Sequence, residues 1–207
     1  MRTASKIVEK IRNTISERVH NIRIYCQMTD IASISRRYFV IGFFDGVLTI
    51  LGMVMGAHLS GKASPEIILT AGVATALALG ISSGWGAYEA ERVEQTLEAD
   101  EKRRMLLRDT KGCTIDRAHA FATYVSSIVH AIAPIPAAIV PLLPYLFLPP
   151  DEAIKATMLI GFSLLFLVGT MMGRIARRNI LVSGLRMVIA GLLTLALVTL
   201  LSPSHVV

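Results

Sequence analysis

The sequence contains few charged residues, few cysteines and none of the motifs that mark common enzymes. Charged residues make up 17% of the 207 residues, whereas soluble domains carry roughly 25%. The two cysteines, Cys26 and Cys113, form no Cys-x-x-Cys pair, which argues against a disulfide framework and favours thiols on the reducing side of a membrane. The chain also has no His-x-x-x-His pair, P-loop, Gly-x-Ser-x-Gly or nucleotide-binding fingerprint. Because no catalytic motif is present, we expect a protein that is not an enzyme.

Long apolar runs take the place of these features. Hydrophobic residues make up 53% of the chain, and the mean hydropathy is +0.58. A helix needs about 20 apolar residues to cross a bilayer, and five runs meet this length: 39–57, 65–87, 118–148, 153–173 and 180–201. The third run carries prolines at 134, 136, 141 and 144, which predict a kink or partial unwinding. The sequence therefore predicts an all-α integral membrane protein with five transmembrane helices.

The distribution of lysine and arginine predicts the orientation. Nineteen of the 21 basic residues lie in segments 1–37, 88–117 and 174–186, and only Lys62 and Lys155 lie on the other side. Basic residues accumulate on the cytoplasmic side of membrane proteins, so we expect a cytoplasmic N-terminus and an external C-terminus. No organelle-targeting feature is visible in the sequence, so we expect a location in the plasma membrane. The net charge of +6 comes from residues that flank apolar runs, and we therefore expect no nucleic-acid partner.

The first 37 residues form a separate segment in front of the five-span domain, which we place at 38–207. Isoleucines at 7, 11, 15 and 22 recur at helical spacing among basic residues. This pattern predicts an amphipathic helix on the cytoplasmic membrane surface or against a partner helix. Within the five-span domain, residues 88–117 form a short acidic insert that continues the second span into the cytoplasm.

Asp45 is the only acid well inside a predicted span. A charged residue at such a position costs about 2.5–3.5 kcal/mol, so its presence needs a reason. Two interpretations remain open: a structural hydrogen bond between helices, or a cation ligand or proton carrier on a path through the membrane. The same span carries glycines at 42, 46, 52 and 56, which favour close contact with other helices. Met53 and Met55 offer soft sulfur ligands, although methionine in an apolar helix more often serves packing.

A second group of acids follows the second span. If the helix continues, Glu91, Glu94, Glu98 and Glu101 lie at i, i+3, i+7 and i+10, within an arc of roughly 80°. Met105 falls on the same stripe. Two interpretations are equally compatible with this spacing: a solvated helix stabilised by salt bridges, or a site that collects divalent metal ions at the cytoplasmic mouth.

Four stretches together resemble the vacuolar iron transporter family. They are FFDGVLTILGMVMGAHLSG from Phe43, ISSGWGAYEAERVEQ from Ile81, AIVPLLPYL from Ala138 and GRIARRNILVSGLRMVIAGLL from Gly173. Their order matches the Asp-Gly first span, the exit of the second span, the proline-bearing third span and the arginine-rich linker of that family. The resemblance covers about residues 35–201.

The resemblance implies a homodimer that exports Fe²⁺, and often Mn²⁺, from the cytosol in exchange for protons. Asp45 would then lie on the translocation path, and the acids after the second span would form a cytoplasmic metal-binding region. Many family members carry Gly-Glu-Tyr where this chain has Gly86, Ala87 and Tyr88; here the carboxylate is Glu89 instead. The expected metal ligands are therefore Asp45, Glu89, Glu91, Glu94, Glu98, Glu101 and Met105. The metal would be cargo, and no cofactor is expected.

Two alternatives to metal export remain open. The protein could be a membrane scaffold or metal sensor that does not transport, in which the acidic helix docks a partner and Asp45 is structural. It could also be a metal-independent transporter or proton channel with the same fold.

Overall fold

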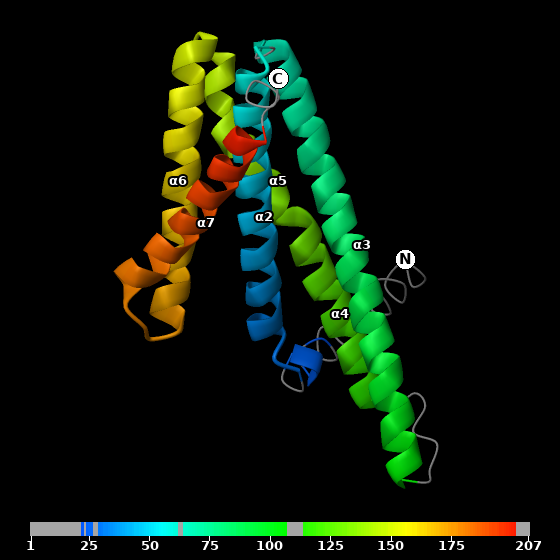
Figure 1. Cartoon of the computed structure of the whole chain (residues 1–207). Coiled ribbons are helices and arrows are strands. Elements are labelled where there is room, and N and C mark those ends of the chain that lie inside the picture. Colours follow the sequence, from blue (N-terminus) through cyan, green and yellow to red (C-terminus); the bar gives the residue numbers. More distant parts are fainter. Residues whose placement is uncertain (1–21, 23, 27–28, 62–63, 107–113, 202–207) are drawn as a thin grey trace, which may run out of the picture.

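The computed structural model describes residues 22, 24–26, 29–61, 64–106 and 114–201. Within these ranges the chain contains helices and no strand (Figure 1). The elements in chain order are α2 (Ile31–Leu59), α3 (Pro65–Leu106), α4 (Thr114–Ile132), α5 (Pro134–Leu142), the short 3-10 helix η1 (Leu143–Leu146), α6 (Pro150–Ile175) and α7 (Ile180–Leu200).

Five helical stretches are long and apolar enough to cross a membrane. They are Ile31–Leu59, Pro65–Glu98, Arg117–Leu146, Pro150–Ile175 and Ile180–Leu200. The prediction of an all-α protein with five spanning helices is therefore confirmed. The first span begins at Ile31, so residues 31–37 are continuous with it. Most of the predicted N-terminal amphipathic helix lies outside the described residues and stays a prediction.

The second span and the acidic insert form one helix. α3 has 42 residues, which at 1.5 Å per residue makes it about 63 Å long. The part Pro65–Glu98 contains a window apolar enough to cross a membrane, and Figure 1 shows the last turns of α3 projecting beyond the neighbouring helices. The helical continuation on which the glutamate stripe depends is thus present as far as Leu106.

The third span is broken at its prolines. α4 ends at Ile132, and α5 begins at Pro134 and passes into η1. Pro141 lies inside α5, and Pro144 lies in η1; neither has a backbone N–H to donate. The hydroxyl of Thr157 on α6 donates to the carbonyl of Pro141 at 2.7 Å, and Thr157 is fully buried. A side chain of a neighbouring helix therefore supplies a donor to a backbone carbonyl at the break, in the way that a bilayer favours.

Helix α2 lies at the centre of the bundle and contacts every other numbered helix. In Figure 1 it lies between the α6–α7 pair and the α3–α4 pair, and α7 crosses it obliquely. One apolar cluster joins α2 to α3, α5, η1 and α6 through residues that include Ile50, Ile68 and Tyr145. A second cluster packs Val47 and Leu51 of α2 against Leu165 of α6.

The outer surface of the bundle is apolar. On α3, Leu77 and Ile81 are 50% and 71% exposed, and on α7, Leu193 and Leu197 are 60% and 58% exposed. An exposed apolar surface of this kind is unfavourable in water and is compatible with contact to the hydrocarbon core of a bilayer.

Candidate functional site

Glycine residues hold α2 against the broken third span. A Cβ added at Gly46 would lie 2.6 Å from the carbonyl oxygen of Pro134 and 2.9 Å from the Cβ of Ala137. A Cβ added at Gly42 would lie 3.0 Å from Nδ1 of His130. A side chain at Gly46 would require the backbone to shift, and one at Gly42 would be tight, so the predicted role of these two glycines in helix contact agrees with the packing within this chain.

Asp45 precedes Gly46 and lies midway along α2, so this close packing also positions the carboxylate. Its side chain is half-buried and lines a cavity of about 400 Å³ between α2, α3 and α7. The other lining residues are Leu48, Thr49, Gly52 and Met53 from α2, Leu79 from α3 and Thr194 from α7. An acid and a methionine of the first span therefore share one cavity in the apolar part of the protein.

The carboxylate of Asp45 forms no hydrogen bond or ion pair with any residue that the structure describes. A structural hydrogen bond between helices, one of the two interpretations of this acid, is thus not formed within the described part of a single chain. Because the cavity reaches the carboxylate, its oxygen atoms are accessible to a small ion or a proton donor.

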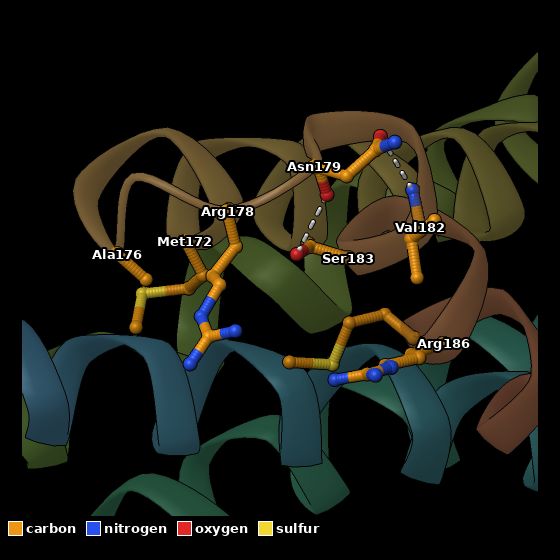
Figure 2. Close-up of a pocket in the computed structure, with 10 residues that line it drawn as sticks. Met172, Ala176, Arg178, Asn179, Val182, Ser183 and Arg186 are labelled. Atoms are coloured by element: carbon orange, nitrogen blue, oxygen red, sulfur yellow. Dashed lines mark hydrogen bonds between the residues drawn. The ribbon is translucent and has the colours of Figure 1, made fainter.

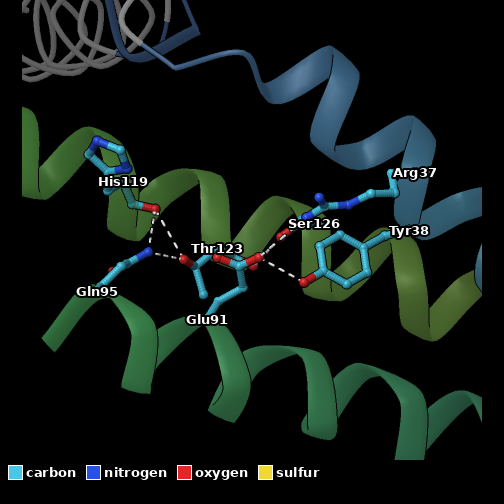
Figure 3. Close-up of polar contacts among 7 residues, drawn as sticks. All are labelled: Arg37, Tyr38, Glu91, Gln95, His119, Thr123 and Ser126. Atoms are coloured by element: carbon cyan, nitrogen blue, oxygen red, sulfur yellow. Dashed lines mark hydrogen bonds and ion pairs between the residues drawn. The ribbon is translucent and has the colours of Figure 1, made fainter. Parts of the chain in front are cut away.

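A polar cluster lies on the same face of α2, two helical turns before Asp45 (Figure 3). The hydroxyl of Tyr38 donates to Oε1 of Glu91 on α3 at 2.7 Å, and the guanidinium of Arg37 lies 4.0 Å from the same oxygen. Residues seven positions apart share a helix face and lie about 10.5 Å apart along the axis. Tyr38 and Asp45 therefore lie on the same face of α2. Tyr38, near the start of the helix, contacts Glu91 of α3, and Asp45 lies at the middle of the helix.

The same cluster connects α3 to α4 and α4 to α2. Gln95 donates to the carbonyl of His119 at 3.1 Å and to the hydroxyl of Thr123. Nδ1 of His130 lies 2.8 Å from the carbonyl oxygen of Tyr38, and the two rings pack with centroids 5.2 Å apart. His130 is 8% exposed, so it behaves as a buried histidine whose hydrogen bond is satisfied.

The predicted glutamate stripe is divided between two environments. Glu91 contacts α2, whereas Glu94, Glu98 and Glu101 are exposed on the projecting part of α3. No group of three or more His, Cys, Asp or Glu residues able to hold a metal ion occurs among the described residues. A single chain therefore does not assemble the stripe into a metal centre within its described part, and the role of these acids stays a prediction.

The remaining two predicted ligands also lie on α3. Glu89 pairs with Arg92, with 3.4 Å between Oε1 and Nη1, in a surface ion pair that contributes little to stability. Met105 lies on the last turn of α3, and its side chain lies outside the described part.

Sequence reasoning missed Tyr38 and Thr194. The spacing of Tyr38 from Asp45 was a usable signal, whereas nothing local pointed to Thr194.

Comparison with known protein families shows which family the chain belongs to. The model of the VIT family matches residues 36–105 and 87–202, a region that includes all five spans and the acidic extension. The chain belongs to the VIT family, the family of the vacuolar iron transporters. It is also 31% identical over 164 residues to the uncharacterized protein MJ0645 of Methanocaldococcus jannaschii, covering 78% of this chain and 84% of that protein. As a VIT family protein it is a multi-pass membrane protein, and family members are transporters rather than enzymes, so membership indicates metal transport across the membrane.

Proposed function

We propose that this VIT family protein exports a divalent transition metal from the cytosol in exchange for protons, with Fe²⁺ as the first candidate and Mn²⁺ as the second. The observation that carries the proposal is Asp45: a carboxylate midway along a spanning helix, lining a cavity of about 400 Å³, with no partner among the described residues.

Electrostatics explains why one carboxylate can exchange a proton for a metal ion. A bare charge is unfavourable in a low-dielectric environment, and the cost falls when the acid is protonated or binds a cation. The two occupied states are therefore alternatives, and a proton arriving from the outer side releases the metal. The thioether of Met53 lines the same cavity, and a soft sulfur ligand favours a transition metal over Mg²⁺ or Ca²⁺.

The exposure of the Asp45 cavity favours a homodimer. The cavity opens on the surface of the single chain, where an ionised acid would otherwise face hydrocarbon at considerable cost. Gly52 belongs to the lining, and small residues permit close approach of a second helix. In the proposed dimer a second copy of the chain covers this face, and two Asp45 residues lie near the axis.

The acidic end of α3 provides the collection step in this proposal. Glu94, Glu98 and Glu101 are exposed towards the end of α3, and Met105 falls on the same stripe. The basic ends of α2, α3 and α6 lie at this end of the bundle (Figure 1), and the positive-inside rule supports a cytosolic position for the collecting region in this proposal. In this proposal the membrane is the plasma membrane, with the N-terminus inside and the C-terminus outside.

Metal flux into proteoliposomes tests this function. Purified protein is reconstituted, a pH gradient is imposed, and uptake of Fe²⁺ or Mn²⁺ is followed with a metal-sensitive dye inside the vesicles. We expect flux that depends on the gradient and that Asp45→Asn abolishes. Asp151→Asn, which removes an exposed acid from the first turn of α6, is the matched control and should transport normally. Full metal flux in Asp45→Asn would refute the exchange at this residue, and absence of any flux in the parent protein would favour a scaffold or sensor.

A further inference from the structure

A second cavity lies at the corner between α6 and α7 and shares no lining residue with the Asp45 cavity (Figure 2). Its volume is about 690 Å³. The corner has a defined backbone: the N–H of Arg178 donates to the carbonyl of Gly173 at 2.9 Å, and Arg177 adopts a left-handed conformation with φ of 52°. This is the hydrogen-bond pattern of a Schellman motif, which usually has glycine at the left-handed position.

Two arginines contribute to this cavity from different turns. Arg178 comes from the corner and Arg186 from the second turn of α7, and Figure 2 shows both guanidinium groups extending to the same side. No described carboxylate forms an ion pair with either of them. The acids of α6, Asp151 and Glu152, lie in its first turn, at the opposite end of that helix.

The position of Arg186 favours an anionic partner. It lies about 9 Å along the axis from Ile180, inside the stretch Ile180–Leu200 that is apolar enough to cross a membrane. Arginine inside such a stretch normally pairs with an anion or faces a water-filled cavity. Guanidinium groups repel metal ions and match the oxygen atoms of a phosphate group, which they bind in a bidentate manner.

The surroundings indicate that the phosphate belongs to a lipid. Met172, Val182 and Met187 form an apolar part of the cavity wall, and Leu181 and Leu185 beside it are 69% and 55% exposed. A lipid can place its headgroup on the arginines and its chains along this apolar surface. The helix terminus itself is not the basis of the site, because Oδ1 of Asn179 already accepts the N–H groups of Leu181 and Val182 at 3.1 and 3.4 Å.

We propose that the cavity at the α6–α7 corner binds the phosphate group of an anionic phospholipid through Arg178 and Arg186. Basic pockets between transmembrane helices on the cytoplasmic side bind anionic headgroups in this way. The bound lipid joins the end of α6 to the start of α7 and stabilises the corner. This site is independent of metal transport.

Native mass spectrometry of the full-length protein in detergent tests the site. The protein is titrated with phosphatidylglycerol, with phosphatidylcholine as the zwitterionic reference and inorganic phosphate as the soluble competitor. We expect preferential binding of phosphatidylglycerol, and at least an approximately tenfold weaker affinity in Arg178→Gln/Arg186→Gln. The matched control, Arg36→Gln/Arg104→Gln, removes two exposed arginines at the same end of the molecule and should bind as the parent does.

A second variant separates lipid binding from loss of charge or folding. Val182→Trp keeps both arginines but fills the cavity, so it should also lose phosphatidylglycerol while its melting temperature in lipid-free detergent stays unchanged. Equal binding of the two lipids, or unchanged binding in the double variant, would overturn the proposal. Displacement of phosphatidylglycerol by an equal concentration of inorganic phosphate would assign the site to soluble phosphate instead. Dissociation of a dimer in the double variant, without any loss of lipid, would assign the arginines to a contact with a second copy.

Discussion

The most direct test of the packing around Asp45 is the substitution Gly46→Ala. The added Cβ would lie 2.6 Å from the oxygen and 2.9 Å from the Cα of Pro134, and 2.9 Å from Cβ of Ala137. Two of these three atoms belong to the backbone, so no rotamer change relieves the contact. Ordinary van der Waals contact begins at 3.4 Å, so α2 and α5 must separate by about 0.8 Å in an interior that is close-packed.

The magnitude follows from two opposing contributions. Overpacking a well-packed core costs about 1–3 kcal/mol, and replacing glycine by alanine inside a helix returns up to about 1 kcal/mol. The net loss in the free energy of unfolding is therefore about 0–3 kcal/mol, or up to about 12 °C in melting temperature for a chain of this size; relative to a glycine-to-alanine change in open space, the full cost of about 1–3 kcal/mol remains. The same displacement moves Asp45 relative to its cavity. Metal flux should therefore fall even at temperatures where the variant remains folded.

The assay compares three purified proteins in one detergent by circular dichroism during heating. The control is Gly86→Ala on α3, where nothing lies within 4 Å of the added Cβ; it should be neutral or stabilised by up to about 1 kcal/mol. If Gly46→Ala melts at the same temperature as Gly86→Ala, the close approach of α2 to α5 is not a feature of the folded protein.

Two further substitutions test other contacts of the bundle. Thr157→Val removes the donor to the buried carbonyl of Pro141 at nearly constant volume. It should cost about 1–3 kcal/mol, measured as a lower melting temperature. Thr70→Val, at an exposed site on α3, is the control, and an equal effect of both substitutions would contradict the role of Thr157 at the break. Tyr38→Phe removes the hydrogen bond to Glu91 and should cost about 1 kcal/mol, because the contact is only partly buried. Thermal melting measures this loss, and an unchanged melting temperature would show that this contact between α2 and α3 does not stabilise the fold.

The spans and the break in the third one could be predicted because both depend on local chemistry. Twenty apolar residues must cross the membrane as a helix, and proline removes a backbone donor wherever it occurs. The glutamate stripe was also predicted from local spacing, because Glu91 and Glu101 share one face if the helix is continuous.

The contacts of the candidate site could not be predicted in the same way, because they join distant parts of the chain. Glu91 belongs to the stripe by spacing, yet it pairs with a residue 53 positions away because it lies level with the start of α2. Glu94 and Glu101 lie farther along α3 and remain exposed. Likewise, the composition of the Asp45 cavity depends on the oblique crossing of α7, which brings Thr194 to α2 and has no signature in a single sequence.

The length of α3 has a mechanical consequence. A helix of about 63 Å that spans the membrane and continues beyond it acts as a lever, with its pivot among the packed helices of the bundle and one end in the aqueous phase. Tilting such a helix by about 10° around its midpoint moves each tip by about 5 Å. Small rearrangements among the buried helices therefore become large excursions at the tip that carries Glu101, and a load at that tip is transmitted back into the bundle.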